Sequence, residues 1–163
     1  MADAATAISR ASREAREKVE GEYGQLSGEK DISRLTFQIG KFAVHDLFDT
    51  NDYANDARID FMNWSILAAG AFDYGADRVG LTYGTAIEWN EKNWAWRAGY
   101  FLMPYVSNAN LMDMALFNRG GYVTELEWRY DANKHPGVLK GGVFLNSVNS
   151  GSYADATALA NQR

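Results

Sequence analysis

Residues 35–42 read Leu-Thr-Phe-Gln-Ile-Gly-Lys-Phe, and residues 43–64 continue as Ala-Val-His-Asp-Leu-Phe-Asp-Thr-Asn-Asp-Tyr-Ala-Asn-Asp-Ala-Arg-Ile-Asp-Phe-Met-Asn-Trp. The first part alternates apolar and polar side chains, which is the period of a β-strand with one apolar and one polar face. The second part is acidic, aromatic and rich in Asn. Because more alternating segments follow, this order predicts a sheet whose loop folds back over one face.

Four other segments of the chain alternate in the same way. Together with residues 32–42 they predict an all-β fold, an antiparallel up-and-down meander of about five strands. These further segments are residues 78–90, 94–103, 120–130 and 138–146.

Short and long connections alternate along this meander. Residues 90–93 and 131–137 form short polar turns, whereas residues 43–77, residues 104–119 and the tail from residue 147 are long. A meander with this alternation places all short turns at one rim of the sheet and all long connections at the other. Outer-membrane barrels have this asymmetry.

Length and composition exclude several classes of protein. The 163 residues suit one domain, and a net charge of −5 without a Lys/Arg-rich run argues against a nucleic-acid partner. The absence of Cys excludes disulfides and thiolate metal sites. Fifteen Gly against two Pro, with 13% aromatic residues, favour strands and turns over long helices. The sequence contains no run of 18 or more apolar residues, so no transmembrane helix is predicted.

The first thirty residues differ from the rest. Residues 1–30 are strongly charged and have no apolar core segment, so no signal peptide is visible in them. Their Glu14–Lys18 pair at i,i+4 predicts a polar, helix-prone segment with a thin apolar face. We therefore divide the chain into residues 1–30 and a sheet-forming part, residues 31–163. A second short helix is expected in the Ala-rich residues 153–161.

Charged residues occupy the polar faces of all five predicted strands. In a soluble sheet such residues would form an ordinary solvated face, whereas in a barrel they would line an aqueous lumen and set its electric field. The candidate lumen-facing residues are Arg34, Glu88, Arg97, Glu125, Glu127, Arg129 and Lys140.

Aromatic residues lie at the strand ends on the opposite, apolar faces. Trp89 and Trp94 flank one short turn, and Trp128 with Tyr130 precedes the next. Amphipathic rings at strand ends are typical of the girdle at a membrane–water boundary. They are also compatible with a soluble sandwich or barrel, so the pattern alone leaves both interpretations open.

Residues 43–64 contain residues that suggest two site chemistries, a calcium loop and a hydrolytic triad. An EF-hand counted from Asp49 would need Gly at Ala54 and Glu at Asp60, so that site is excluded, although calcium held by a differently shaped loop stays open. His45 beside Asp46 lacks a nucleophilic Ser in an elbow motif. We expect no catalytic site, no resident metal and no cofactor.

Specific motifs resemble the carbohydrate-selective porin (OprB) family of Gram-negative outer membranes over roughly residues 30–155. In the first half of the chain they are Gly40-Lys41-Phe42, Asp46-Leu-Phe-Asp49, Asn55-Asp-Ala-Arg58, Phe61-Met-Asn-Trp64 and Gly70-Ala-Phe-Asp-Tyr74. In the second half they are residues 94–104, Phe117-Asn-Arg-Gly-Gly-Tyr-Val123, Glu125-Leu-Glu127, Asn146-Ser147 and Ser150-Gly-Ser-Tyr153.

The resemblance implies a barrel of about sixteen strands in the outer membrane, in contact with lipid, through which sugars diffuse passively. Mono- or oligosaccharides would bind weakly and leave unchanged. A long loop narrows the lumen in such porins, and residues 43–77 occupy its position. The implied constriction and sugar-contact residues are Asp46, Asp49, Asp60, Asn63 and Trp64.

The chain also departs from the family pattern. Ala57 stands where the family has Pro, and residues 1–30 replace upstream strands with a polar segment. Five strands cannot close a barrel, and lipid does not tolerate an open sheet edge. We therefore expect a fragment or truncated member, with a homo-oligomer possible for the full-length parent.

A second interpretation is a soluble all-β carbohydrate-binding module. In that case Trp94, Trp96 and Trp128 would form a stacking platform for sugar rings. Solubility without detergent distinguishes this module from a porin fragment.

Overall fold

The computed structural model describes residues 8–11, 16–21, 26–51, 54, 58–59, 74–107, 109–148 and 153–161. It contains eight strands, one 3₁₀ turn and one α-helix within these ranges. In chain order they are β1 (Ile8–Ala11), β2 (Arg16–Val19), β3 (Gly28–Asp31), β4 (Arg34–Phe42), η1 (Val44–Asp46), β5 (Thr82–Asn90), β6 (Trp94–Phe101), β7 (Gly120–Ala132), β8 (His135–Ser147) and α1 (Tyr153–Ala160).

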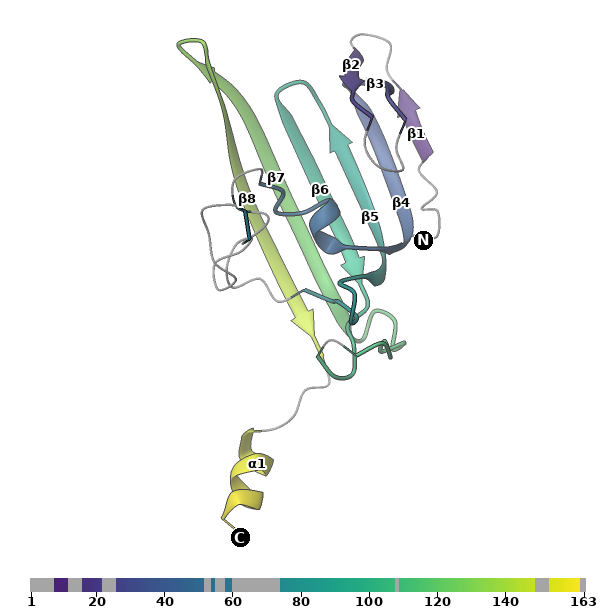
Figure 1. Cartoon of the computed structure of the whole chain (residues 1–163), viewed down its shortest axis with the longest axis vertical. Coiled ribbons are helices and arrows are strands. Elements are labelled where there is room, and N and C mark those ends of the chain that lie inside the picture. The colour runs from purple at the N-terminus through teal and green to yellow at the C-terminus, as the bar shows by residue number, and fades with distance from the viewer. Residues whose placement is uncertain are drawn as a thin grey trace.

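Six strands form one antiparallel sheet in the order β1-β4-β5-β6-β7-β8 (Figure 1). From β4 to β8 each strand pairs with its neighbour in the chain, so the all-β, up-and-down meander is confirmed. Strands β2 and β3 pair with each other in a separate two-stranded sheet. Strands β1 and β8 are the two edges of the main sheet.

The two rims of the sheet differ as the connections predict. Figure 1 shows the β5–β6 and β7–β8 turns at one end of the sheet. The chain leaves β4, β6 and β8 at the opposite end, where the long connections begin. We call these ends the short-turn rim and the long-connection rim.

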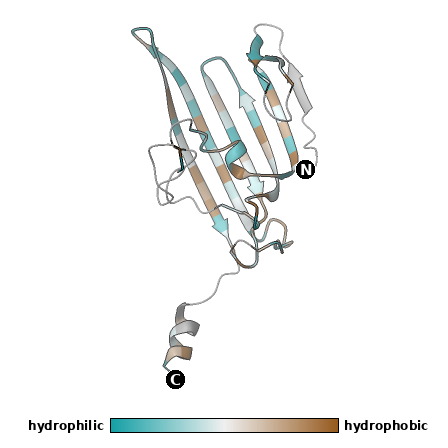
Figure 2. Cartoon of the chain, in the orientation of Figure 1, coloured by the Kyte–Doolittle hydropathy of each residue, from teal (hydrophilic) through white to brown (hydrophobic). Residues whose placement is uncertain are grey.

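The sheet is apolar on its exposed face and polar on its covered face. Along β7, Leu126 and Trp128 are 54% and 58% exposed, whereas Glu125 and Glu127 between them are only 6% exposed. The alternation of hydropathy along the strands from β4 to β8 is visible in Figure 2. A water-soluble sheet buries its apolar face instead, so this arrangement fits a sheet whose outer face meets an apolar environment.

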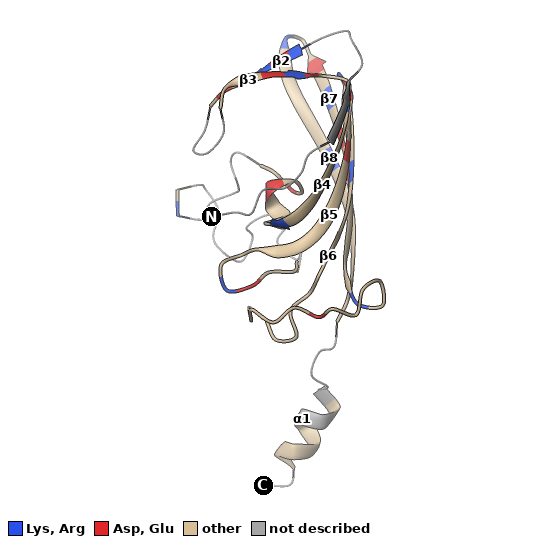
Figure 3. Cartoon of the chain, turned by 90° about the vertical axis from the view of Figure 1, so that its right-hand side faces the viewer, with Lys and Arg blue, Asp and Glu red and all other residues tan. Residues whose placement is uncertain are grey.

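The segment after β4 covers the polar face. Seen with the sheet turned by 90°, η1 lies to one side of strands β4–β6 (Figure 3). Phe48, two residues beyond η1, joins a buried apolar cluster with Phe42 of β4 and Phe101 of β6. This cluster is the core of the described residues, and it lies on the same side of the sheet as Glu125 and Glu127.

The prediction of a polar helix in residues 1–30 was wrong for the described residues, which form β1, β2 and β3. Strand β1 pairs with β4, with Ile8 opposite Phe37. Strands β2 and β3 are linked by ion pairs from Arg16 to Glu29 and Asp31. Charged residues favour helix only weakly, and strand pairing outweighs that preference.

The turn predicted at residues 131–137 was too long. Strands β7 and β8 extend to Ala132 and His135, and only Asn133 and Lys134 lie between them. Both have positive φ, 53° and 68°, as a two-residue type I′ hairpin requires. Pro136 is accommodated within β8 because β8 is an edge strand.

The predicted C-terminal helix is confirmed as α1, and Figure 1 shows it beyond the long-connection rim, away from the sheet. Among the residues that the structure describes, no helix has the length and apolar character needed to cross a membrane.

Asp77 anchors the chain where it enters β5. Its side chain is almost fully covered, pairs with Lys41 Nζ at 2.6 Å and accepts hydrogen bonds from the backbone N–H groups of Val79 and Leu81. Lys41 and the two N–H groups lower the pKa of Asp77 to about 2. A carboxylate with a depressed pKa stabilises the fold above its unfolded pKa of about 4.

We therefore expect the stabilisation due to Asp77 to be lost as the pH falls from about 4 to about 2. The Asp77→Asn variant keeps an acceptor for both N–H groups but has no titrating charge. Its denaturant midpoint should lie below that of the parent at pH 7 and converge with it near pH 2. Equal pH dependence in the two proteins would contradict the assignment.

Candidate functional site

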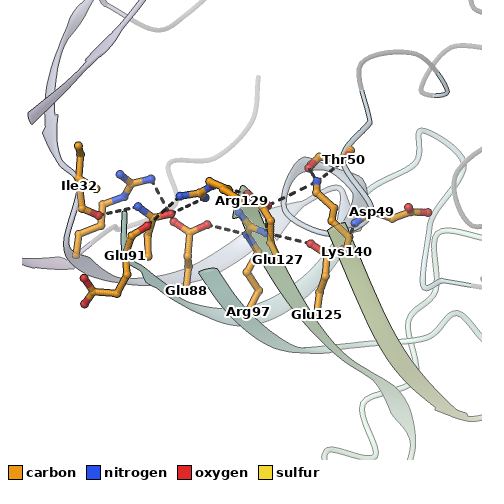
Figure 4. A network of polar contacts seen from close by, with 12 residues as sticks. Ile32, Asp49, Thr50, Glu88, Glu91, Arg97, Glu125, Glu127, Arg129 and Lys140 are labelled. Carbon is orange, nitrogen blue, oxygen red and sulfur yellow. Dashed lines mark hydrogen bonds and ion pairs between the residues drawn. The ribbon is translucent and has the colours of Figure 1, made fainter. Parts of the chain in front are cut away.

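The seven charged residues predicted on the polar faces form one network across β4 to β8 (Figure 4). We call this network the charge ladder. Register brings its members together: Glu88 lies opposite Arg97, Arg97 opposite Glu125, and Glu127 opposite Lys140. Because side chains alternate between faces with period two, residues in phase on neighbouring strands share one face.

Arg97 is the centre of the charge ladder. Its Nε lies 2.7 Å from Glu88, and one terminal nitrogen lies 3.0 Å from Glu125 and 2.8 Å from Glu127. The planar guanidinium holds its N–H donors in a fixed fork, which lets one side chain reach carboxylates on both neighbouring strands. The Arg97 side chain is only 11% exposed, so its charge is compensated by the three carboxylates rather than by water.

The ladder continues on both sides of Arg97. Toward β4, Arg34 lies 3.4 Å from Glu88 and 2.6 Å from Glu17 of β2, which ties the small sheet to the large one. Toward β8, Glu127 pairs with Arg129 at 2.7 Å and with Lys140 at 3.7 Å. Acidic and basic groups thus alternate across five strands.

A second line of hydrogen bonds runs nearer the short-turn rim. Arg129 donates to Asn90 Oδ1 at 2.8 Å and to the backbone carbonyl of Glu91 at 2.9 Å. The fully buried Asn90 donates in turn to the carbonyl of Ile32 at 2.6 Å. Asn90 is not among the residues predicted from the sequence, although it shares the phase of Glu88 along β5.

The start of the long connection is fastened to the ladder. The backbone N–H of Asp49 donates to Glu125 at 2.7 Å, and Lys140 Nζ donates to both oxygens of Thr50 at 2.6 Å. Phe48 packs edge-to-face on Phe101, with ring centroids 5.9 Å apart. Residues 48–50 therefore contact the polar face of the sheet.

Two of the five residues predicted for the constriction, Asp46 and Asp49, lie among the described residues. Asp46 is exposed and closes the η1 turn by accepting the N–H of Ala43 at 3.2 Å. Asp49, half-buried with φ of 54°, contacts the ladder through its backbone. The other predicted contacts, Asp60, Asn63 and Trp64, lie outside the described residues, as do most acidic residues of the possible calcium loop.

His45 lies on η1 between the acidic residues and Tyr74. The two rings meet edge-to-face at 4.1 Å. Burial lowers the pKa of His45 and outweighs the opposing effect of Asp49 and Asp46. The imidazole is thus neutral at pH 7 and adds no positive charge to this part of the loop.

A recess lies between this loop and the β7–β8 hairpin. It has a volume of about 670 Å³ and is bordered by loop backbone and by charged groups of the ladder. Its lining includes Asp49, Thr50, Asn51, Glu127, Pro136 and Lys140. A smaller cavity of about 180 Å³ adjoins Phe48, Glu125 and Phe144. Carboxylate, ammonium and amide groups at one recess can exchange hydrogen bonds with a polyhydroxylated solute.

The three tryptophans predicted as a stacking platform lie on the opposite face. Trp94 is directly across from Trp128, and Trp96 follows in the same phase. Trp96 Nε1 donates to Thr124 Oγ1 at 3.0 Å, but most neighbours on that face are apolar, for example Trp89, Leu126 and Leu139, rather than the set of polar groups that would orient a sugar. The surroundings favour contact with an apolar phase over sugar stacking.

The sequence also matches a protein family. The family model described as "Carbohydrate-selective porin, OprB family" matches residues 19–163. No curated protein and no solved structure matches the chain.

Proposed function

Because the chain belongs to the OprB family of carbohydrate-selective porins, a family of outer-membrane proteins, we propose that its sheet forms one arc of a sugar-conducting pore. The observation that carries the proposal is the inverted polarity of the sheet, with apolar side chains exposed and charged side chains covered. The polar face would border the lumen, and the apolar face would contact outer-membrane lipid.

The charge ladder suits permeants without net charge. Its seven members comprise four cations, Arg34, Arg97, Arg129 and Lys140, and three glutamates, and Glu17 of β2 supplies a fourth carboxylate through its ion pair with Arg34. A compensated wall provides donors and acceptors for hydroxyl groups without a strong field that favours one ion. Mono- or oligosaccharides would bind weakly, pass by diffusion and undergo no reaction.

We further propose that residues 43–77 narrow this pore. The docking of Phe48, Asp49 and Thr50 on the ladder supports an inward position for the start of the loop. In this proposal Asp46, Asp49, Asp60, Asn63 and Trp64 contact the passing sugar, and the ladder forms the facing wall. A homo-oligomer of the assembled porin is part of the same proposal.

The test is sugar entry into vesicles. The full-length porin, in which this sheet would form one arc of the closed barrel, is expected to let neutral sugars enter phospholipid vesicles at rates that fall with sugar size. Replacing Asp49 and Asp60 together by Asn should change the relative rates for different sugars by removing two acceptors with full charge.

A matched variant changes the same charge elsewhere. Glu20→Gln with Asp131→Asn removes two exposed carboxylates far from the loop in sequence, and should leave the rates unchanged. Unchanged rates in the Asp49/Asp60 variant would contradict the role of the loop. A monomer that stays soluble without detergent, and whose Trp fluorescence shifts with sugar, would instead indicate a soluble carbohydrate-binding module.

A further inference from the structure

The connection between β6 and β7 exposes large apolar side chains at the long-connection rim. Met114 and Phe117 are 66% and 75% exposed, and Leu111 and Leu116 are also exposed. We call these four residues the rim patch. Large apolar side chains grouped in a single connection of this length indicate a contact surface.

Two tyrosines hold the rim patch in place. Tyr100 Oη accepts the backbone N–H of Phe117 at 2.9 Å and donates to the carbonyl of Arg119 at 2.8 Å. Tyr122 Oη donates to the carbonyl of Phe117 at 3.0 Å. The chain at Phe117 has φ of 64°, which an L-residue adopts only when its surroundings enforce it.

Phe117 lies over the apolar face of the sheet. Its ring stacks on that of Tyr100, with centroids 5.1 Å apart and an interplanar angle of 25°. Tyr100 lies opposite Tyr122, and both share the phase of Trp96 and Trp128 on the exposed face. Through Phe117, the rim patch therefore adjoins the apolar face beyond the last residues of β6 and the first of β7.

The charged groups of this connection are turned to one another. Arg119 pairs with Asp113, a carboxylate almost fully covered by protein, and Asp113 also accepts the N–H of Ala115 at 2.9 Å. This ion pair closes the connection into a compact turn. The apolar side chains of the connection can therefore face a nonpolar phase without an unpaired charge entering that phase with them.

We propose that the rim patch inserts into the lipid at the membrane boundary and anchors the long-connection rim there. Aromatic rings with hydroxyl groups suit this boundary, because the ring body meets lipid and the hydroxyl meets polar groups. Continuity with the apolar face favours lipid over a second copy of the chain as the occupant. The proposal rests on the membrane location of the sheet proposed above.

A spin label reports the environment directly. Since the chain has no Cys, Phe117→Cys gives a single labelling site. The labelled chain is reconstituted in vesicles of phosphatidylethanolamine and phosphatidylglycerol, and its accessibility to oxygen and to a nickel chelate is measured. We expect an oxygen-to-nickel ratio several-fold higher than at Asn133→Cys in the short turn, and a similar result for Met114→Cys.

A third site, Leu126→Cys in the middle of β7, separates the two proposals. Lipid exposure at Leu126 with water exposure at both Phe117 and Met114 would overturn the anchor and leave the membrane sheet intact. Water exposure at all three sites would overturn the proposed pore and the anchor together. Exclusion of both reagents at Phe117, with broadening between labels, would identify a second copy as the occupant and overturn the lipid contact.

A pair of variants tests the tyrosine contacts. Tyr100→Phe with Tyr122→Phe removes the three hydrogen bonds to residues 117–119 and should raise label mobility and nickel accessibility at position 117. Tyr130→Phe removes a hydroxyl from the same face at the other rim and should change neither value. An unchanged label in the double variant would contradict the role of the tyrosines.

Discussion

Replacing Arg97 by Met is expected to lower the free energy of unfolding by about 3 kcal/mol, because a covered ion network loses its central cation. Arg97 is the partner that Glu88, Glu125 and Glu127 share, and its side chain is 11% exposed. Glu88 on β5 and the two glutamates on β7 would then repel one another across β6 on the polar face. The denaturant midpoint in detergent or lipid measures the loss, and a pore would become more cation-selective.

Two further variants separate charge from geometry. Arg97→Lys keeps the charge but not the fork that reaches three carboxylates, so it should recover only part of the stability. Adding Glu125→Gln to Arg97→Met removes one of the carboxylate charges left without a partner. This double variant should also recover part of the lost stability. Arg78→Met removes the same charge from an exposed turn and should have little effect. Equal midpoints for Arg97→Met and Arg78→Met would contradict a structural role for the ladder.

Alternation in the sequence predicted the strands and the two faces of the sheet. Period two places Glu88, Arg97 and Glu125 on the polar side of their own strands, so their shared face follows without knowing how the strands pair. The individual ion pairs do not follow from the pattern. They depend on register, and register is set by turn length, which was overestimated for the turn between β7 and β8.

The polarity of the sheet relative to solvent was not decided by alternation alone. A soluble sheet and a barrel arc have the same pattern, and only the covering of one face distinguishes them. Here the covering segment begins with Phe48, an aromatic residue in an otherwise acidic stretch. Phe101, which broke the apolar–polar alternation of β6 on the polar side, was the complementary signal, and the two rings meet in the structure.

The N-terminal segment was the main error. Its Arg, Glu and Lys residues favour helix, but the preference is small for each residue, and the i,i+4 pair adds only a few tenths of a kcal/mol. Pairing as an edge strand stabilises this segment more than a helix would, because the backbone of Ile8–Ala11 forms a ladder with residues 34–37 of β4. A strand of four residues is too short to show a recognisable alternation of apolar and polar residues in the sequence, so this long-range pairing could not be predicted.

Replacing Phe48 by Ala is expected to undock the start of the long connection from the polar face. Phe48 is 1% exposed, and its ring meets Phe101, which in turn lies so close over Gly84 and Gly99 that a Cβ at either glycine would clash with it. Truncation of a buried Phe costs about 3–5 kcal/mol through lost contacts and an empty volume. Because the segment is a connection, the cost can appear as local opening while the strands stay paired.

Hydrogen exchange at the amide of Asp49 measures this opening, since that amide is protected by its bond to Glu125. A loss of about 3 kcal/mol in local stability corresponds to exchange on the order of 100-fold faster. Phe117→Ala makes the same truncation at an exposed ring and should leave the amide protected. Unchanged exchange in Phe48→Ala would mean that the bonds from Glu125 and Lys140 hold the loop without the aromatic contact. Faster exchange with intact strand amides, together with quicker sugar entry into vesicles, would establish that Phe48 holds the loop in the path of the permeant.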